Sequence, residues 1–281
     1  RGRKDLENLS IPFIGEIPQY LSAKKKLGFD KHTQSVMKAI VVKEGNRNII
    51  NEAFRVLRSN IDFMAGKDSG QNVFMLTSFN PGSGKSFLAM NIAMSFAIKK
   101  KRILVIDGDL RHGSTSSYVD SPKTGLSDYL GNRVSDWKEI IVKDEKYDNL
   151  HIIPIGTVPP NPTELLEDGK LATLIEVLRS EYDYIVIDCP PIDIVADAQI
   201  IEKLADRTVF VVRSGLLDRS MLPELENIYQ EKRFKNLSVI LNGTESAGGR
   251  YGYRYGYRNG YSSYYGNKGK MGGVNGWSSS D

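Results

Sequence analysis

The feature that most constrains the fold is the segment T-S-F-N-P-G-S-G-K-S at residues 77–86, which directly follows the apolar run Val73–Leu76. This order predicts a buried strand, a tight turn through glycines and then a helix. At such a turn, backbone N–H groups without helical partners point outward, and the helix dipole adds partial positive charge. The segment is therefore interpreted as a phosphate-binding loop, and the chain as a nucleotide-binding protein.

The side chains of this loop have different expected roles. Lys85 supplies a full positive charge to the phosphates from what we expect to be a solvent-facing loop, and the Ser86 hydroxyl is placed to bind Mg²⁺. Phe79 stands where the common pattern G-x-x-x-x-G-K-S has its first glycine, so the detailed shape of the loop stays open. The residues predicted to bind the nucleotide are Ser78, Asn80, Pro81, Gly82, Ser83, Gly84, Lys85, Ser86 and Phe87.

Alternating apolar strands and helices predict an α/β fold. Segments such as Ile185–Ile187 and Val209–Val212 are apolar on both faces, which is typical of a parallel sheet covered by helices on both sides. The expected fold is a mostly parallel twisted sheet of the phosphate-loop NTPase type, with ligands bound beyond the carboxyl ends of the strands. Expected strands lie at 73–77, 103–107, 151–155, 184–188, 208–212 and 237–241, and expected helices at 48–65, 86–99, 126–142, 163–180, 196–204 and 219–233.

The 281 residues are predicted to divide into three parts. Residues 1–45 form an N-terminal arm with a short strand near Ile14–Pro18, residues 46–247 form the nucleotide-binding domain, and residues 248–281 form a tail. Seven of the 14 tyrosines fall between Tyr251 and Tyr265 of this tail, in a Gly/Arg/Ser background without apolar periodicity, so we expect it to be disordered. No apolar run is long enough to span a membrane, and the single Cys189 excludes disulfides within the chain.

Two further apolar strands are followed by carboxylates at the predicted carboxyl edge of the sheet. The run 103–106 leads into Asp107-Gly108-Asp109, and the run 185–187 leads into Asp188. Asp188 is expected to hold Mg²⁺ through water, opposite the Ser86 hydroxyl. The predicted metal ligands are Ser86, Asp107 and Asp188.

The spacing of Asp107 and Asp109 suggests a second task. In an extended chain the two carboxylates point to the same side, so either one could accept a proton from an attacking hydroxyl. Arg111 lies two residues further on and could offset their repulsion. The predicted catalytic residues are Lys85, Asp107 and Asp109.

Together these motifs resemble the bacterial tyrosine kinases, the cytoplasmic kinase domains of polysaccharide co-polymerases that govern capsule and exopolysaccharide export. The resemblance covers essentially the whole chain. It rests on the phosphate loop, D-x-D-x-R at 107–111, D-x-P-P at 188–191, E-x-x-R-x-x-R at 52–58 and the C-terminal tyrosine cluster. Related chromosome-partitioning and septum-placing ATPases usually carry an extra lysine early in the loop, where this chain has Asn80.

The resemblance implies a protein-tyrosine kinase that uses ATP and Mg²⁺. In this family, tail tyrosines are phosphorylated by a neighbouring subunit within a homo-oligomeric ring, and the E-x-x-R-x-x-R helix, here Glu52, Arg55 and Arg58, mediates that ring. The resemblance also implies membrane-spanning helices in the same polypeptide or in an activator, a cognate tyrosine phosphatase, and a position at the cytoplasmic face of the bacterial inner membrane. The tyrosines expected to be phosphorylated are Tyr251, Tyr253, Tyr255, Tyr257, Tyr261, Tyr264 and Tyr265.

Two other interpretations stay open. An ATPase switch of the chromosome-partitioning type, without kinase activity, would use the same loop and Asp188 but would leave the tyrosine-dense tail unexplained. A nucleic-acid-binding tail would use its arginines interleaved with tyrosines. From Ser246 onward, however, five basic residues and one acidic residue account for the whole net charge of +4. The neutral body offers no basic face, so we expect no nucleic-acid partner.

Overall fold

The structure is a computed structural model that describes residues 2–20, 39–66, 70–192 and 196–245. Within these ranges the chain forms an eight-stranded sheet with the order β1-β8-β7-β2-β6-β3-β5-β4. Neighbouring strands run parallel except β4, which is antiparallel to β5, so the predicted mostly parallel sheet is confirmed. The strands are β1 (Phe13–Pro18), β2 (Val73–Thr77), β3 (Ile103–Asp107), β4 (Val142–Lys143), β5 (Leu150–Ile153), β6 (Tyr184–Asp188), β7 (Arg207–Arg213) and β8 (Leu237–Thr244).

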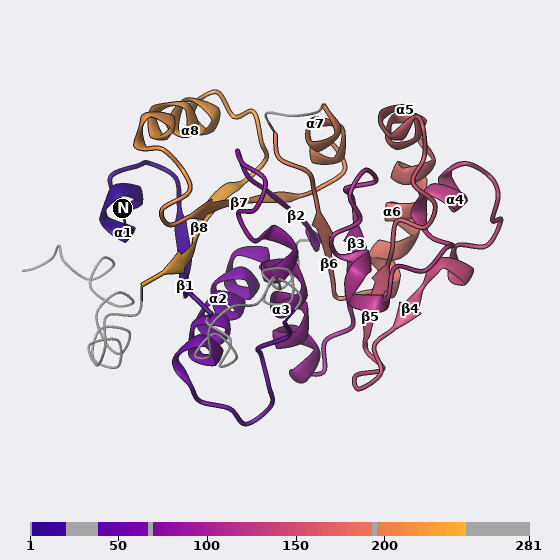
Figure 1. Ribbon diagram of the computed structural model, residues 1–281, viewed down its shortest axis with the longest axis horizontal. Coiled ribbons are helices and arrows are strands. Elements are labelled where there is room, and N and C mark those ends of the chain that lie inside the picture. The colour runs from indigo at the N-terminus through magenta and orange to yellow at the C-terminus, as the bar shows by residue number, and fades with distance from the viewer. Residues whose placement is uncertain (1, 21–38, 67–69, 193–195, 246–281) are drawn as a thin grey trace, which may run out of the picture. The chain divides into compact units, whose positions relative to one another are not determined.

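Helices cover both faces of this sheet. Figure 1 shows α2 and α3 on one side of the strands, and α7 and α8 on the other. The α-helices of the described residues are α1 (Arg3–Glu7), α2 (Ile49–Ala65), α3 (Lys85–Ile98), α4 (Leu126–Leu130), α5 (Pro162–Glu167), α6 (Lys170–Glu181), α7 (Asp197–Glu202) and α8 (Leu222–Gln230). Short 3-10 helices are η2 (Ser116–Val119), η3 (Trp137–Ile140) and η4 (Arg219–Met221).

The alternation of side chains along each strand divides the core into two layers. On β2, Val73 and Met75 belong to one buried cluster, together with residues of α5, α6, α7 and α8. Phe74 and Leu76 belong to the other, together with residues of α2 and α3. Because β2 is buried along its whole length, its near-continuous apolar sequence reflects packing on both faces.

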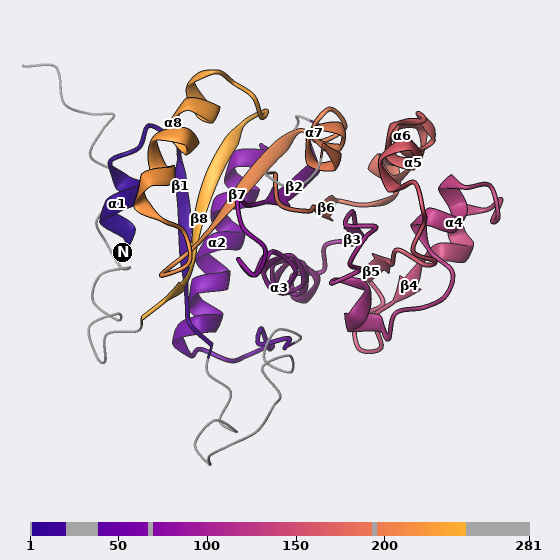
Figure 2. The same ribbon diagram turned by 45° about the horizontal axis from the view of Figure 1, so that its top comes forward.

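The short strand expected in the N-terminal arm is present. β1 runs parallel to β8 and forms an edge of the sheet, and the side-chain amide of Asn60 on α2 donates to the Ile14 carbonyl at 2.8 Å. Figure 2 shows β1, β8 and β7 side by side, with α1 and α8 next to them. Helix α1 was not expected from the sequence, and its one buried side chain, Leu6, packs into the core.

Two helices expected as single elements are broken, which corrects the prediction. The segment 126–142 is α4 followed by a turn, η3 and β4, because the chain turns at Gly131 and at Asn132, which has a φ of 59°. The segment 163–180 is α5 and α6, because Gly169 between them adopts a φ of 86°. Helical apolar spacing continues through both segments, but these left-handed residues reset the direction of the chain.

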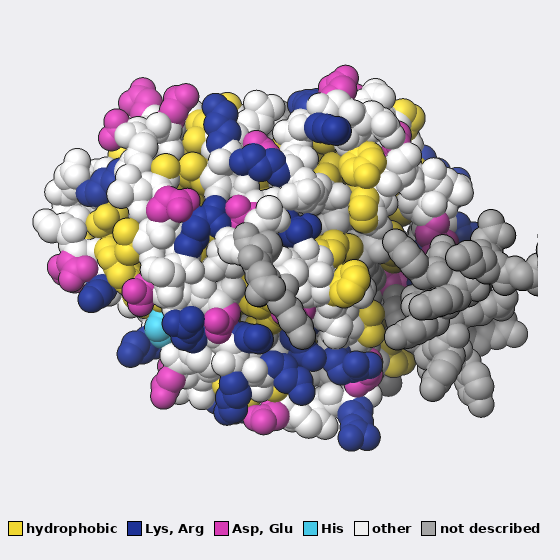
Figure 3. Space-filling model, turned by 180° about the vertical axis from the view of Figure 1, so that it is seen from behind, with side chains coloured by type: hydrophobic (Ala, Val, Ile, Leu, Met, Phe, Trp, Pro, Cys, Tyr) yellow, Lys and Arg dark blue, Asp and Glu magenta, His cyan; other side chains and the backbone are white. Residues whose placement is uncertain are grey.

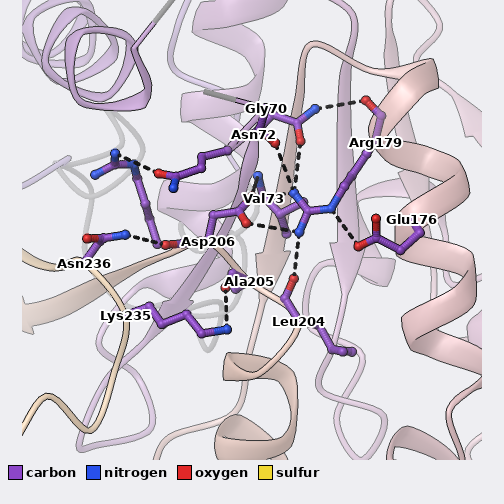
Figure 4. Close-up of polar contacts among 12 residues, drawn as sticks. Gly70, Asn72, Val73, Glu176, Arg179, Leu204, Ala205, Asp206, Lys235 and Asn236 are labelled. Atoms are coloured by element: carbon purple, nitrogen blue, oxygen red, sulfur yellow. Dashed lines mark hydrogen bonds and ion pairs between the residues drawn. The ribbon is translucent and has the colours of Figure 1, made fainter. Parts of the chain in front are cut away.

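At the amino ends of the strands, an ion-pair network joins α6 to the sheet (Figure 4). The Arg179 guanidinium donates to both oxygens of Asp206, at 2.6 and 3.1 Å, and to Glu176 at 2.9 Å. Asp206 also accepts the backbone N–H of Val73 at 2.9 Å, and Asn72 donates to the Arg179 carbonyl at 3.1 Å. The network lies at the edge of the sheet opposite to the phosphate loop, so its role is to hold α6, β2 and β7 together.

The surface carries charges of both signs. On the face that Figure 3 shows, Lys and Arg side chains gather along the lower part, and Asp and Glu side chains lie among them. Among the described residues, no helix combines the length and apolar character that a membrane span requires.

Candidate functional site

The predicted phosphate loop connects the carboxyl end of β2 to the amino end of α3. Gly82 and Gly84 have φ angles of 74° and 91°, a region that side chains other than glycine rarely adopt. The loop is closed on itself, because the hydroxyls of Ser78 and Ser83 each donate to the Asn80 carbonyl at 2.8 Å. A Cβ on Gly84 would also collide with the side chain of Asn242. Glycine is therefore required at this point for two reasons, backbone conformation and space.

Residues that are distant in sequence donate hydrogen bonds to this loop and fix its position. The Asn242 amide on β8 donates to the Ser83 carbonyl at 2.9 Å, and Arg213 at the end of β7 donates to the Gly82 carbonyl at 2.7 Å. Phe79 is 3% exposed and packs edge-on against Phe210, with ring centroids 4.9 Å apart. The departure from the common glycine pattern is thus an anchor that fixes the loop to the core.

Lys85 is the first residue of α3, and only 9% of it is exposed, so the expectation of a solvent-facing lysine was wrong. Its ammonium donates to the Ser78 hydroxyl at 3.1 Å, which folds the side chain back over the loop. Burial lowers the pKa of Lys85, while the charges of Asp188 and Asp109 oppose that shift. A partly dehydrated cation at this position is suited to the negative charge of a polyphosphate.

Ser86 and Asp188, two of the predicted metal ligands, are in direct contact. The Ser86 hydroxyl donates to Asp188 Oδ2 at 2.5 Å, and the Thr115 hydroxyl donates to the same oxygen at 2.7 Å. The other oxygen, Oδ1, is buried and has no hydrogen-bond partner in the part of the chain that the structure describes. Burial raises the pKa of Asp188, against the opposing effects of the Ser86 hydrogen bond and the Lys85 charge.

Asp107 lies opposite Asp188 on the adjacent strand and is completely buried. Its Oδ2 accepts the backbone N–H of Ser116 at 2.7 Å and the Ser116 hydroxyl at 2.6 Å. Burial, followed by the charge of Asp188, raises the pKa of Asp107 well above its usual range. Two buried carboxylates at neighbouring strand ends repel each other unless a proton or a cation lies between them.

Asp109 follows the end of β3 and has a different environment. Its two oxygens lie 3.1 and 3.0 Å from Nδ1 of His112, and its side chain is 12% exposed. The sequence suggested that Arg111 could offset the repulsion between Asp107 and Asp109, but the Arg111 side chain points to other partners. Its guanidinium instead contacts the buried Asp197 at 3.3 Å and the Thr163 hydroxyl at 3.0 Å.

The donor set Ser86, Asp107 and Asp188 fits a magnesium ion. Among the described residues Asp188 Oδ1 is buried and has no hydrogen-bond partner, and such an atom is costly unless a ligand satisfies it. In the part of the chain that the structure describes, no cluster of three or more His, Cys, Asp or Glu side chains is placed to hold a metal. Proteins commonly hold Mg²⁺ with one or two carboxylates, water and substrate phosphates, and Asp107 and Asp188 could supply such carboxylates.

The predicted oligomerisation residues lie on α2. Arg55 donates to Glu52 at 2.8 Å, and both side chains are substantially exposed. Arg58 instead donates to the backbone carbonyl and hydroxyl of Ser95 on α3, at 3.1 and 3.2 Å. The seven tail tyrosines predicted to be phosphorylated lie outside the described residues.

Sequence reasoning missed several residues of the site. Hydrogen bonds to the two carboxylates come from Thr115, which contacts Asp188, and from Ser116, which contacts Asp107. The loop is bound by Asn242 and Arg213. His112 contacts Asp109. Only the Ser/Thr-rich run 114–117, directly after D-x-D-x-R, could have signalled the first two. The other contacts depend on which strands become neighbours in the sheet.

Known proteins resemble this chain in both sequence and structure. Residues 71–233 match the AAA domain family. The chain is 33% identical over 210 residues to the putative tyrosine-protein kinase CapB of Staphylococcus aureus, a match that covers 74% of this chain and 91% of that protein. It is also 34% identical over 250 residues to a putative tyrosine-protein kinase in the cps region of Klebsiella pneumoniae. That match covers 86% of this chain but 33% of the longer relative.

A solved structure extends the resemblance to three dimensions. The kinase domain of the Escherichia coli tyrosine kinase ETK superimposes with a TM-score of 0.75 at 27% identity, over 92% of this chain and 99% of that domain. The two chains therefore share the same overall fold.

Proposed function

This chain belongs to the bacterial tyrosine kinases and is a protein-tyrosine kinase, and we propose that it phosphorylates the tail tyrosines of neighbouring subunits within a ring. The observation that carries the proposal is the convergence of Lys85, Ser86 and Asp188 at the end of β2, with one buried carboxylate oxygen left open. The acceptor would be the tyrosine-dense segment 251–265, which directly follows the last strand and its short extension.

Each residue of the site has a proposed part in binding ATP. The backbone N–H groups of the loop and the Lys85 ammonium would bind the phosphates, and the N-terminal dipole of α3 would add to their attraction. Ser86, Asp188 and Asp107 would hold Mg²⁺, which when bound neutralises phosphate charge. Asn242 and Arg213 would keep the loop in shape, because each binds one of its carbonyls.

The two candidate proton acceptors differ in their surroundings. Asp107 is completely buried, and one of its oxygens is occupied by Ser116. Asp109 lies beyond the strand end and is partly accessible. We therefore assign acceptance of the tyrosine proton to the neighbourhood of Asp109, and Mg²⁺ binding to Asp107. Catalysis would consist mainly of positioning and charge stabilisation, as is usual in phosphoryl transfer.

We further propose a place in surface-polysaccharide export. A relative of this chain is named for a cps region and is about three times as long as the matched part. A membrane-spanning segment of the same polypeptide, or a separate membrane activator, would hold the kinase at the cytoplasmic face of the inner membrane. A cognate phosphatase would remove the phosphate groups from the tail tyrosines. Nucleic acid would not be a partner.

A mixing experiment tests transfer between subunits. One chain carries Lys85→Met with an intact tail, and the other keeps Lys85 but ends at Ala247. After incubation with labelled ATP, we expect phosphotyrosine on the intact tail, because the truncated chain supplies the active site. Absence of label there would show that transfer is not intermolecular, and release of free phosphate alone would favour an ATPase switch.

The control is the Lys85→Met chain by itself. Loss of the charge should lower phosphorylation by about 100-fold or more, as for other transition-state charge stabilisers. Methionine fills a similar volume, and Lys85 is mostly buried, so thermal unfolding should occur at the wild-type temperature or slightly above it. Wild-type phosphotyrosine in this purified chain would contradict the assigned role of Lys85.

A further inference from the structure

Asp109 and His112 form a pair in which the histidine is the accessible member. The Asp109 side chain is 12% exposed, whereas that of His112 is 66% exposed. Nδ1 of the imidazole lies within hydrogen-bond distance of both carboxylate oxygens, at 3.1 and 3.0 Å. An incoming hydroxyl would therefore meet the outer nitrogen, Nε2, before it could reach the carboxylate.

The two basic side chains nearest to Asp109 have other hydrogen-bond partners. Arg111 turns away to Asp197 and Thr163, so it does not neutralise Asp109. Lys85, whose charge interacts with Asp109, donates to Ser78 in the loop. The Asp109 carboxylate accepts the backbone N–H of Arg111 at 3.3 Å and still lies within hydrogen-bond distance of Nδ1 of His112. It can therefore fix the ring of His112, as a carboxylate fixes the tautomer of histidine in hydrolytic triads.

We propose that His112 is the group that takes the proton from the acceptor tyrosine, with Asp109 as its positioning residue. In this step the tyrosine O–H bond breaks as the phenolic oxygen attacks the γ-phosphorus of ATP. The proton goes to Nε2 of His112, and the bond between the γ-phosphorus and the bridging oxygen breaks to release ADP. Asp109 stabilises the resulting imidazolium through Nδ1–H, and the proton then passes to water.

This inference refines the proposed function at one point, because it replaces direct proton acceptance by Asp109. It requires the kinase activity of the chain but neither the ring nor the tail. The test therefore uses two acceptors, a peptide that copies residues 248–266 and a synthetic Glu/Tyr copolymer. Failure of the tail peptide alone would reject the proposed substrate and leave the copolymer as the readout for His112.

The informative variant is His112→Ala with added imidazole. We expect kcat for tyrosine phosphorylation to fall by about 100-fold or more, the usual contribution of a general base, with an unchanged KM for ATP. Because His112 is exposed, its removal leaves room for free imidazole, which should restore part of the rate. In the double variant His112→Ala/Asp109→Asn, imidazole should have no effect, because nothing orients it.

Two further measurements separate chemistry from structure. Acceptors with fluorinated tyrosine, whose phenol loses its proton more easily, should be less sensitive to His112→Ala than ordinary tyrosine. His151→Ala is the matched control. The His151 ring lies on β5 and contacts the Tyr182 hydroxyl and the Asp148 carbonyl, so the phosphorylation rate of this variant should match that of the wild type. A wild-type rate in His112→Ala, or a loss that imidazole does not relieve, would overturn the inference.

Discussion

At the scale of single residues, Asp188 illustrates how a strand end can be prepared for a cation. Its Oδ2 accepts two hydroxyl groups, from Ser86 and Thr115, which fix the direction of the carboxylate. Its Oδ1 is buried and finds no hydrogen-bond partner among the residues that the structure describes, and an unsatisfied buried polar atom costs about 1–3 kcal/mol. The site is therefore more stable with a ligand at Oδ1 than without one.

The variant Asp188→Asn tests this interpretation. Asparagine can still accept from Ser86 and Thr115, but it presents an uncharged NH₂ group where the open oxygen was. We expect the affinity for ADP in the presence of Mg²⁺ to fall by about 10- to 100-fold. This is the range typical for the mutation of a residue in the outer coordination shell of a metal. Calorimetric titration with ADP, with and without Mg²⁺, measures the change, and the affinity without Mg²⁺ should not fall.

The matched control is Asp183→Asn, which lies directly before the other end of β6. Asp183 pairs with Arg102 at 3.2 Å and is remote from the phosphate loop, so its loss should leave the Mg²⁺ dependence of ADP binding unchanged. Equal Mg²⁺ dependence in Asp188→Asn and in the wild type would remove Asp188 from the proposed metal site.

At the scale of secondary-structure elements, Asp128 determines where the start of α4 is attached to the rest of the fold. Asp128 Oδ2 accepts the backbone N–H groups of Gly125 and Thr157, both at 3.0 Å. The backbones of Gly125 and Gly156 approach so closely that a Cβ on either would collide with the other. The carboxylate thus joins the start of α4 to the segment after β5, next to the residues that follow β3.

We expect Asp128→Asn to destabilise the fold by about 1–2 kcal/mol at pH 7, as hydrogen bonds to a charged acceptor are lost. Burial opposes ionisation, but the N–H groups of Thr157 and Gly125 outweigh it, and the pKa of Asp128 is lowered in the folded chain. Because its folded pKa is lowered, ionised Asp128 stabilises the folded chain at pH values above the ordinary carboxyl pKa of about 4. This contribution is lost as the pH falls through the lowered pKa of the folded state.

Urea unfolding at pH 7 and at about pH 3 measures this difference. The gap in unfolding free energy between the wild type and Asp128→Asn should narrow at the lower pH. Asp136→Asn is the control, because that carboxylate is exposed and, among the described residues, accepts just the Lys138 N–H at the start of η3. A gap of equal size at both values of pH would show that charge is not the cause.

At the scale of the whole molecule, α2 carries the residues proposed to join neighbouring subunits. The structure divides them into two groups. Glu52 and Arg55 pair with each other on the surface and are available to a neighbour. Arg58 is half-buried and holds α2 against α3 through Ser95, so it stabilises its own chain. A variant that removes all three would mix loss of assembly with loss of stability.

Separate variants resolve the two effects. Glu52→Ala/Arg55→Ala should dissociate the oligomer and reduce tail phosphorylation, with the free energy of unfolding within about 0.5 kcal/mol of the wild type. Arg58→Ala should lower that free energy by about 1–2 kcal/mol, because it removes two charge-assisted hydrogen bonds. Light scattering measures the oligomer and urea unfolding the stability. An unchanged oligomer in the double variant would leave Glu52 and Arg55 as a solvated surface pair.

The sequence by itself determined the features that local chemistry specifies. A glycine-rich turn between an apolar strand and a helix indicates a phosphate loop, and apolar runs ending in Asp107 and Asp188 indicate strand ends at one sheet edge. These conclusions need only neighbouring residues, because backbone conformation and side-chain periodicity are short-range properties. The same locality explains the two broken helices, since apolar spacing alone does not record a left-handed residue such as Gly169.

Only the tertiary structure decided which side chains complete the site. Asn242 reaches Ser83 across 159 positions of sequence, and Thr115 reaches Asp188 across 73. Arg111 had a nearby candidate partner in Asp109 and yet bonds Asp197 on α7. Such pairings depend on strand order and on helix placement, which arise from burying apolar surface over the whole chain, so no local pattern specifies them.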